Sequence, residues 1–312
     1  MAHFIFDGQT GFYTGKVRDV YTIKDDLIVL IVSDRLSAFD VVLPRTIPFK
    51  GQVLNEIAAY MLDQCRNICP NWLLDVPGPT ASAGKKCIPF ELEIVVRGNL
   101  TGHAWRTYRS GLRTLCGVTL PEGMQENDFF PQPIITPSTK SHTGHDKDIS
   151  EEEIILNGLA SDYDWNIIQN YALQLFERGK AIARNQSLIL ADTKYEFGKL
   201  GEVIYLMDEI HTPDSSRFFY ADGFNERQKK GEKQKQLSKE FVREWLMDNG
   251  FMGRIGDNIP VMTDEITEGI SRRYFELYEN LTGRSFLPKP ISNEDLFVKI
   301  NLSLKKIRDT IM

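Results

Sequence analysis

Three ionisable residues alternate along one short segment of the chain: Asp192, Lys194 and Glu196. The apolar segment before them, Leu188–Ala191, predicts a strand, and side chains two positions apart on a strand share a face. An acid, a base and an acid on one face could hold a metal ion and a phosphate together. A solvated strand face that carries these charges by chance is the alternative.

The next predicted strand, Val203–Met207, ends directly before Asp208. Gly198 and Gly201 predict the turn that joins the two strands. In the register that we expect, Asp208 lies opposite Asp192, with the two Cβ atoms about 4.5–5.5 Å apart. Two carboxylates so close repel unless a cation lies between them, and oxygen ligands suit Mg²⁺. A register that differs by one residue would turn Asp208 to the other face.

Groups that suit a phosphate follow in the segment Asp208–Arg217. Ser215 and Ser216 stand directly before Arg217. A planar guanidinium fork with two hydroxyl donors matches phosphate oxygens. The segment is therefore a candidate phosphate site, and an Asp-Ser turn with a surface arginine is the alternative.

A glycine turn near the N-terminus, Gly15-Lys16-Val17-Arg18, could present two cations to a triphosphate. It superficially resembles a Walker A loop, but Val17 stands where that loop has the Ser or Thr that binds Mg²⁺. The chain has no G-x-G-x-x-G, G-x-S-x-G or H-E-x-x-H motif. The segment His142–Asp146 invites a metal-binding interpretation, which its glycine and loop composition disfavour.

Four cysteines, Cys65, Cys69, Cys87 and Cys116, are sparse for a chain of 312 residues. Cys65 and Cys69 lie one turn apart in a predicted helix, without the further ligands that a zinc site needs. We expect reduced, mostly buried thiols rather than a metal site or disulfides. Reduced thiols indicate the cytoplasm.

The composition is that of a folded chain with a sizeable core, since 42% of the residues are hydrophobic and 26% are charged. The net charge of −6 argues against a nucleic-acid partner, which usually meets a basic surface. The longest aliphatic run, Leu27–Val32, is far shorter than the roughly 20 residues that span a bilayer. Met1–Gly8 does not predict a secretory signal. We therefore expect neither a nucleic-acid nor a membrane partner.

Predicted strands and helices mix along the chain without regular alternation, which favours an α+β fold. Ser150 and Glu153 form a capping box that begins a helix, and a buried stripe from Trp165 to Ile182 predicts the next helix. Other helices are expected over 53–65, 239–248 and 266–281, and another strand over 88–96. Proline, glycine and charge predict a loop over 70–86, an irregular functional segment over 117–148 and a solvated loop over 225–240.

Six segments, in the same order along nearly the whole chain, resemble the SAICAR synthetase (phosphoribosylaminoimidazole-succinocarboxamide synthase) family of purine biosynthesis. Each segment alone is unspecific, but the ordered set is specific. The six are Gly15–Tyr21, Ser33–Asp40, Val96–Gly102, Thr136–Lys140, Asp192–Gly198 and Asp208–Arg217. Phe241–Leu246 and Leu281–Gly283 resemble the longer form of the family.

The resemblance implies a two-lobed α+β fold related to ATP-grasp enzymes, with the nucleotide bound between the lobes. A β-rich nucleotide-binding lobe would span residues 1–96, and an α+β lobe with the metal and ribonucleotide sites would span residues 97–312. The implied enzyme is an ATP-dependent ligase that joins the carboxylate of carboxyaminoimidazole ribonucleotide (CAIR) to the amine of L-aspartate. It would release SAICAR, ADP and phosphate, use Mg²⁺, and act as a cytoplasmic monomer or homodimer.

The resemblance also implies roles for single residues. Nucleotide contacts would come from Lys16, Arg18, Glu91, Lys194 and Glu196, with adenine on backbone atoms of the strand Glu91–Val96. Catalytic roles would fall to Lys194, Asp192 and Asp208, and metal binding to Asp192 and Asp208. CAIR would contact Glu93, Arg97, Asp214, Ser215, Ser216 and Arg217, with Arg97 and Arg217 at its phosphate. L-Aspartate would lie near Ser33, Ser37 and Asp40.

One position departs from the family pattern, because His103 stands where the family usually has Ser. Its imidazole could donate to the 5′-phosphate of CAIR in place of the hydroxyl, or it could turn away. Two other functions remain open: a carboxylate–amine ligase that takes a different amine, and a nucleotide-binding regulatory module without turnover. The presence of Lys194, Asp208 and Arg217 favours an enzyme.

Overall fold

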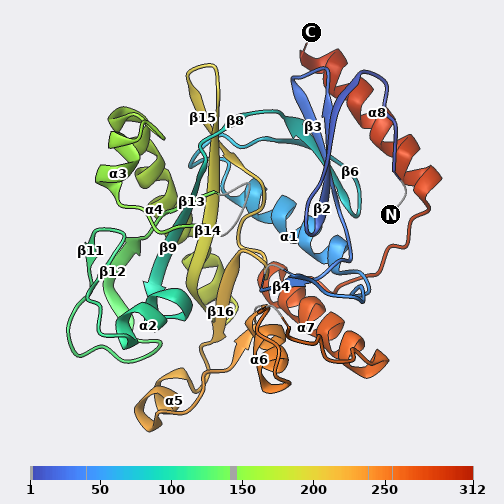
Figure 1. The fold of residues 1–312 in the computed structure, drawn as a ribbon. Helices are drawn as coiled ribbons and strands as arrows, with labels where there is room; N and C mark the ends of the chain where they lie inside the picture. Colours follow the sequence, from blue (N-terminus) through green and yellow to red (C-terminus); the bar gives the residue numbers. More distant parts are fainter. Residues whose placement is uncertain (1–2, 40, 141–145, 238, 255, 312) are drawn as a thin grey trace.

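Two antiparallel sheets organise the molecule, and helices lie beside and between them (Figure 1). The computed structural model describes residues 3–39, 41–140, 146–237, 239–254 and 256–311. Two predictions fall outside these residues: the substrate role of Asp40, and the metal-binding interpretation of His142 and His145. The described helices include none that is both long enough and apolar enough to cross a membrane.

The first sheet is built from the N-terminal part of the chain. Its strands are, in spatial order, β1 (Gln9–Thr14), β2 (Arg18–Ile23), β3 (Leu27–Val32), β7 (Ala81–Lys85) and β6 (Leu73–Gly78). In β3, Leu30 and Val32 belong to the main core, while Val29 and Ile31 belong to a second core on the opposite face. Because both faces are covered, β3 is apolar along its whole length rather than alternating.

The second sheet has the long strand β14 at its centre. The path across it is β12 (Phe129–Ile135), β9 (Leu92–Asn99), β14 (Leu188–Leu200), β16 (Ser216–Tyr220) and β17 (Gln236–Leu237). The shorter strands β8 (Ile88–Pro89) and β15 (Val203–Met207) also pair with β14, and β13 (Ser138–Thr139) pairs with β9. Two small ladders complete the strands: β4 (Ser37–Ala38) with β5 (Val41–Val42), and β10 (Thr114–Leu115) with β11 (Val118–Thr119).

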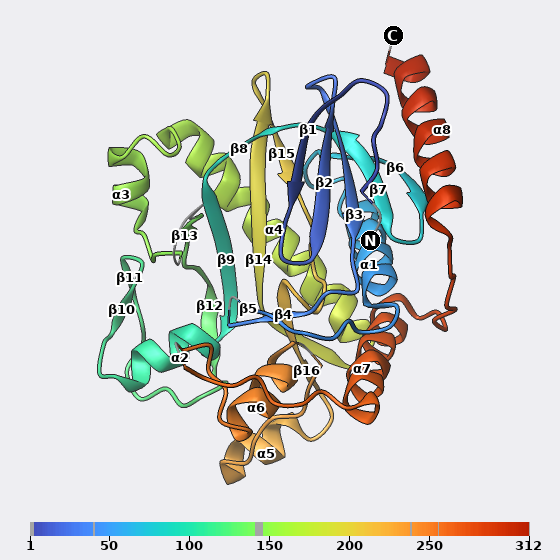
Figure 2. The same ribbon diagram turned by 45° about the vertical axis from the view of Figure 1, so that its right-hand side comes forward.

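Helices cover the sheets on several sides (Figure 2). Helix α1 (Lys50–Gln64) packs against the first sheet and against α7 (Asp264–Thr282), and α4 (Asp162–Asn185) crosses β14 and β9. Helix α8 (Asn293–Ile311) packs on β6 and β7. The remaining helices are α2 (Gly102–Arg109), α3 (Glu151–Leu156), α5 (Phe224–Lys230) and α6 (Glu240–Asp248).

Several predicted elements are confirmed, among them β3, the stripe of α4 and the capping box at Ser150 and Glu153. The predicted loop over 70–86 is wrong, because β6 and β7 form a hairpin there. The predicted loop over 225–240 is also wrong in part, since α5 and β17 lie within it. Gly198 lies inside β14 rather than in the turn, and α8 was not predicted.

The mixed α+β class is confirmed. The predicted lobe boundary between residues 96 and 97 falls within β9, and α8 brings the C-terminal end of the chain onto the N-terminal sheet. The division into lobes therefore remains a proposal, and the two sheets are its structural basis. The four cysteines are free, and three of them are buried.

Candidate active site

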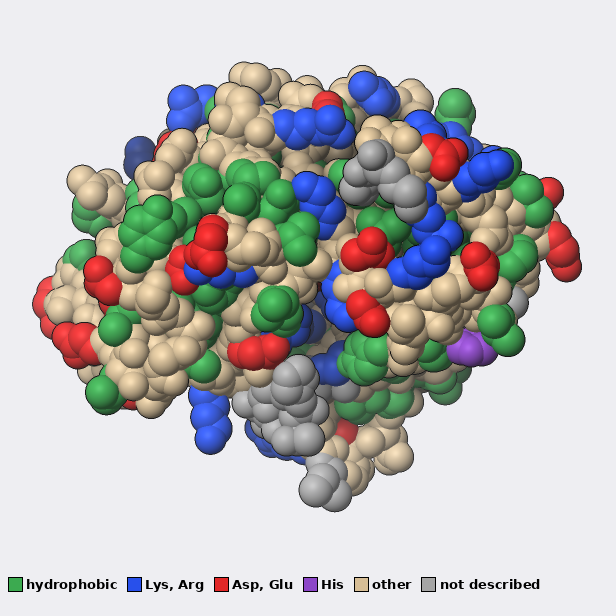
Figure 3. All heavy atoms as spheres, turned by 90° about the horizontal axis from the view of Figure 1, so that it is seen from above, with side chains coloured by type: hydrophobic (Ala, Val, Ile, Leu, Met, Phe, Trp, Pro, Cys, Tyr) green, Lys and Arg blue, Asp and Glu red, His purple; other side chains and the backbone are tan. Residues whose placement is uncertain are grey.

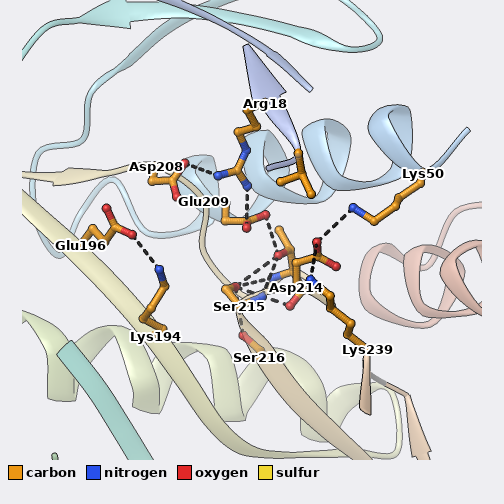
Figure 4. A network of polar contacts seen from close by, with 12 residues as sticks. Arg18, Lys50, Lys194, Glu196, Asp208, Glu209, Asp214, Ser215, Ser216 and Lys239 are labelled. Carbon is orange, nitrogen blue, oxygen red and sulfur yellow. Dashed lines mark hydrogen bonds and ion pairs between the residues drawn. The ribbon is translucent and has the colours of Figure 1, made fainter. Parts of the chain in front are cut away.

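Lys194 and Glu196 share one face of β14, as the alternation predicted. Lys194 Nζ lies 2.7 Å from Glu196 Oε1 (Figure 4) and 2.5 Å from Oε1 of Glu93, which reaches over from β9. Burial alone would lower the pKa of Lys194, but the two carboxylates outweigh it and raise that pKa. The structure thus holds a charged ammonium group on this face.

Glu196 is held from a second side by Lys140, whose Nζ donates to Glu196 Oε2. Burial would raise the pKa of Glu196, but Lys194 and Lys140 lower it to about 2. Lys140 belongs to the Thr136–Lys140 segment, yet sequence reasoning gave it no role. Lys140 and Glu196 are 56 positions apart in the sequence, so residue spacing does not reveal that they pair.

Asp192 lies between two arginines instead of facing a second carboxylate. Its neighbours across the ladders of β14 are Arg97 on β9 and Arg217 on β16. Asp192 Oδ2 accepts from Arg217 Nη1 and, at 2.5 Å, from Thr101 Oγ1, and it lies 3.5 Å from Arg97 Nη1. Arg97 is further fixed by a 2.8 Å bond from its Nε to Thr136 Oγ1. This arrangement orients two guanidinium groups side by side.

The expected pairing of Asp208 with Asp192 is wrong. In the hairpin, Glu196 lies opposite Met207 and Phe197 opposite Leu206, so the register differs from the expected one by three residues. Three residues along a strand are about 10 Å, too far for two carboxylates to share one ion. The geometric argument for a metal site between Asp192 and Asp208 is therefore lost.

Asp208 instead pairs with Arg18. It follows β15 with a φ of 56°, and its Oδ1 lies 2.5 Å from Arg18 Nη1, while Glu209 Oε1 lies 2.5 Å from Arg18 Nη2. Burial would lower the pKa of Arg18, but these two carboxylates raise it. The described residues include no cluster of three or more metal-ligating side chains. The adjacent carboxylates of Asp208 and Glu209 nevertheless offer the hard oxygen donors that fit Mg²⁺ carried by a phosphate.

The turn between β15 and β16 is anchored by a buried carboxylate, Asp214 (Figure 4). Its Oδ2 lies 3.0 Å from Lys50 Nζ and 3.6 Å from Lys239 Nζ, and its Oδ1 accepts a 2.7 Å bond from Tyr274. Burial would raise the pKa of Asp214, but Lys239, Lys50 and the Tyr274 hydroxyl lower it. Asp214 is therefore a charged anchor inside the protein.

A cavity of ≈ 140 Å³ opens beside this anchor. It is lined by Asp192, Pro213, Asp214, Ser215, Ser216, Arg217, Lys239 and Arg243. Three cations and two hydroxyls in one small hollow suit a phosphate. Figure 3 views the molecule from above, and basic side chains gather near the centre of that face with acidic ones beside them.

Gly102 allows a close approach at the side of this cavity. Its φ is 53°, and a Cβ atom there would lie only 2.7 Å from Arg217 Nη2. The following residue, His103, directs its Nε2 to Asp148 Oδ2 at 2.7 Å, and both side chains are about half exposed. The imidazole is thus engaged by a carboxylate, and its phosphate contact remains a proposal.

The turn Gly15–Arg18 is braced by the segment expected near L-aspartate. Ser33 Oγ donates to the Val17 carbonyl at 2.7 Å, and Arg35 donates to the carbonyls of Gly15 and Lys16 at 3.0 and 3.2 Å. Lys16 itself is exposed, and Ser37 is buried in β4. Arg35 was missed because two of its three partners are backbone oxygens, and the third, Asp19, lies 16 positions away in the sequence.

The strand expected at the adenine is an interior strand. β9 pairs with β12, β13 and β14, and the carbonyls of Glu91 and Val95 accept from Lys140 N at 3.0 Å and Thr136 N at 2.8 Å. Backbone groups of this strand thus pair with its neighbours, and the adenine contact remains a proposal. A nucleotide role for Glu91 remains a proposal.

Comparisons with known proteins show the family of this chain. The family model for SAICAR synthetase matches residues 11–258. The chain belongs to this family. Phosphoribosylaminoimidazole-succinocarboxamide synthase of Cytophaga hutchinsonii is 61% identical over 292 residues, which cover 94% of each chain. The enzyme of Bacteroides fragilis is 58% identical and covers 93% of each chain.

Solved structures of the family share the fold. SAICAR synthase from Saccharomyces cerevisiae, complexed with SAICAR, superposes with a TM-score of 0.76 and 32% identity. That match covers 89% of this chain and 95% of the yeast chain. A SAICAR synthetase described as a complex with ADP has a TM-score of 0.68 and 24% identity, which supports the fold alone. The matched family segment ends before α7 and α8.

Residues missed by the sequence prediction come from distant parts of the chain. They are Arg35, Thr101, Lys140, Glu209, Lys50, Lys239, Arg243 and Tyr274. The last four lie in helices or directly beside one, and no pattern along the sequence links them to Asp214 or Arg217. Only the tertiary contacts reveal their common site.

Proposed function

We propose that this protein joins the carboxylate of CAIR to the amine of L-aspartate at the expense of ATP, forming SAICAR, ADP and phosphate. The observation that carries the proposal is the pair of charged sites on one sheet. Lys194 lies between carboxylates on the face of β14, and a cation-lined cavity lies beside Arg217 on β16. Membership of the SAICAR synthetase family supports the same reaction.

The nucleotide is placed between the two sheets in this proposal, in a two-lobed arrangement related to ATP-grasp enzymes. Lys16 and Arg18 come from the first sheet, while Lys194 and Glu196 come from the second. Cations from both sides would offset the charge of the triphosphate. Arg18 is already fixed by two carboxylates, so it would meet the phosphates with little loss of side-chain entropy.

Mg²⁺ would be held by phosphate oxygens together with Asp208 and Glu209. When bound, the ion would neutralise charge that develops on the transferred phosphoryl group. Asp192 takes a different role in this proposal, because Arg97 and Arg217 surround it. It would orient both guanidinium groups toward the ribonucleotide.

CAIR would place its 5′-phosphate in the cavity of Ser215, Ser216 and Arg217, with Lys239 and Arg243 as further cations. Glu93, Arg97, Asp214 and His103 complete the proposed CAIR site, and Ser33, Ser37 and Asp40 the proposed L-aspartate side. The yeast relative was solved with SAICAR bound, which supports a ribonucleotide site in this fold.

The chemistry requires an activated carboxylate, because a free carboxylate would have to expel oxide when an amine attacks it. Transfer of the γ-phosphoryl group of ATP to the carboxylate oxygen gives an acyl phosphate and ADP. The aspartate amine then attacks the acyl carbon, phosphate leaves, and the nitrogen loses a proton. Lys194 would stabilise the charge on the transferred group, since it is held charged on that face.

An ADP-release assay tests the proposal. ADP should appear only when CAIR, L-aspartate and Mg²⁺ are all present. Equal release with asparagine in place of aspartate would refute the substrate assignment, and a screen of other amines would then test the alternative ligase. No release under any condition would favour a binding module. A cytoplasmic location is part of the proposal and is supported by the four free cysteines.

A further inference from the structure

Helix α7, near the C-terminal end of the chain, reaches the proposed ribonucleotide site. Its Tyr274 is 1% exposed, and its hydroxyl donates a 2.7 Å hydrogen bond to Asp214 Oδ1. The two residues are far apart in sequence but directly in contact. A buried hydroxyl aimed at a buried carboxylate fixes the orientation of both side chains.

The other oxygen of Asp214 is held by two lysines. Lys50, on α1, is 0% exposed and lies 3.0 Å from Asp214 Oδ2, and Lys239 lies 3.6 Å from the same oxygen. Lys50 Nζ also lies 5.5 Å above the ring of Tyr274. Burying these charges costs free energy unless each is paired, so a fixed geometry is needed. Because the Tyr274 hydroxyl binds Asp214 Oδ1, Asp214 Oδ2 stays oriented toward the two lysines.

Asp214 stands in the turn that leads into β16. Ser215 N and Ser216 N both donate to the Thr212 carbonyl, at 3.2 and 2.9 Å, so this turn is tight. Its next residues, Ser215 to Arg217, line the ≈ 140 Å³ cavity, and so does Lys239. A contact that holds Asp214 in place therefore also positions the side chains of this turn that would bind the phosphate.

We propose that Tyr274 is a positioning residue of the ribonucleotide site, which acts through Asp214 on the 212–217 turn and on Lys239. This inference rests on the proposed function and extends it to helix α7. Tyr274 does not line the cavity, so its effect passes through Asp214. The proposal predicts that loss of the Tyr274 hydroxyl weakens the binding of CAIR but not the binding of ATP.

The test is Tyr274→Phe, which removes only the hydroxyl. We expect the KM for CAIR to rise about 5- to 10-fold, since a bond to a charged group is lost, with kcat and the KM for ATP within about twofold. The control is Tyr278→Phe on the same helix, because Tyr278 is also buried but lies near a different carboxylate, Glu56. Urea denaturation should show similar stability losses for the two variants, but only Tyr274→Phe should lose affinity for CAIR.

An unchanged KM for CAIR in Tyr274→Phe, or an equal rise in Tyr278→Phe, would overturn the inference. If the wild-type protein itself neither binds nor converts CAIR, the proposed function fails instead. If Tyr274→Phe does not fold, amide hydrogen exchange of the wild-type protein tests the inference instead. If Tyr274 affects CAIR binding, CAIR binding must in turn affect the segment around Tyr274. CAIR should slow exchange of α7 amides around Tyr274, whereas a non-hydrolysable ATP analogue alone should not. Equal exchange with and without CAIR would contradict the inference.

Discussion

At the scale of single residues, Lys194 is the cation at the centre of a group of ion pairs on β14. Its ammonium group meets Glu93 and Glu196, and a second lysine, Lys140, meets Glu196 from the other side. Each charge is paired, so the group can stay ionised although it is largely buried. Such a preorganised cation needs little rearrangement when a phosphoryl group arrives.

Lys194→Met should lower kcat about 10-fold or more, because it removes the cation proposed to stabilise the transferred group. Steady-state ADP release at saturating ATP, CAIR and L-aspartate measures this effect. The matched control is Lys199→Met, because the side chain of Lys199 is 29% exposed, as is that of Lys194, but it pairs with Asp164. A Lys194→Met variant that folds and turns over like wild type would mean that this face is merely solvated.

Glu196 gives the site an acid-sensitive contribution to stability. Its pKa of about 2 in the folded protein lies below its ordinary value of 4.5, so its pairing stabilises the fold above about pH 4.5. That contribution disappears as the pH falls toward 2. Glu196→Gln should therefore destabilise by up to about 3 kcal/mol at pH 6 and by much less near pH 2.5.

Urea unfolding of Glu196→Gln and wild type at several pH values measures this difference. Glu202→Gln serves as the control, because the Glu202 side chain is 98% exposed on the same hairpin. Its difference from wild type should stay small and constant with pH. A pH-independent loss in Glu196→Gln would contradict the charge argument.

At the scale of elements, the β1–β2 turn is held by side-chain contacts from the following segment. Arg35 bonds two carbonyls of the turn and also Asp19 Oδ1 at 2.8 Å. Ser33 bonds a third carbonyl, that of Val17. The turn that carries Lys16 and Arg18 is therefore fixed before any nucleotide arrives.

Arg35→Lys should raise the KM for ATP about 3- to 10-fold, because lysine keeps the charge but not the planar fork of donors. The KM for CAIR should change by less than about twofold. Arg45→Lys is a suitable control, since Arg45 bonds Asp264 and the Met262 carbonyl on another surface. Equal ATP kinetics in the Arg35→Lys variant and wild type would show that the turn needs no such brace.

At the scale of the whole molecule, the C-terminal helix closes the N-terminal sheet. Leu296, Ile300, Leu304 and Ile307 of α8 share a core with Tyr21, Ile23, Val29 and Ile31. The two ends of the chain are thereby joined in one packed unit (Figure 1). The sheet that carries Lys16 and Arg18 depends on this packing for its outer face.

Ile300→Ala should destabilise the protein by about 2–4 kcal/mol, because it leaves a cavity in this core. Leu302→Ala on the outer side of the same helix should change stability by less than about 0.5 kcal/mol, since Leu302 is 64% exposed. Urea unfolding compares the two variants. Similar losses for both would mean that α8 is not docked as described.

Local pattern was enough for elements whose signals lie within a few residues, such as the run Leu27–Val32 and the cap at Ser150. It failed for the β6–β7 hairpin, because prolines and glycines there suggested a loop. Gly84 shows the reason: a Cβ atom there would lie 2.1 Å from the Trp72 carbonyl oxygen. The glycine is needed for close packing between strands, which a sequence reading cannot see.

The sequence by itself determined that Lys194 and Glu196 share a face, because side-chain alternation is a local property of any strand. The ordered motifs also indicated the family. Only the tertiary structure decided that Asp192 faces arginines, that Asp208 meets Arg18 and that Tyr274 holds Asp214. These pairings depend on hairpin register and on packing between distant segments, which residue spacing along the chain does not fix.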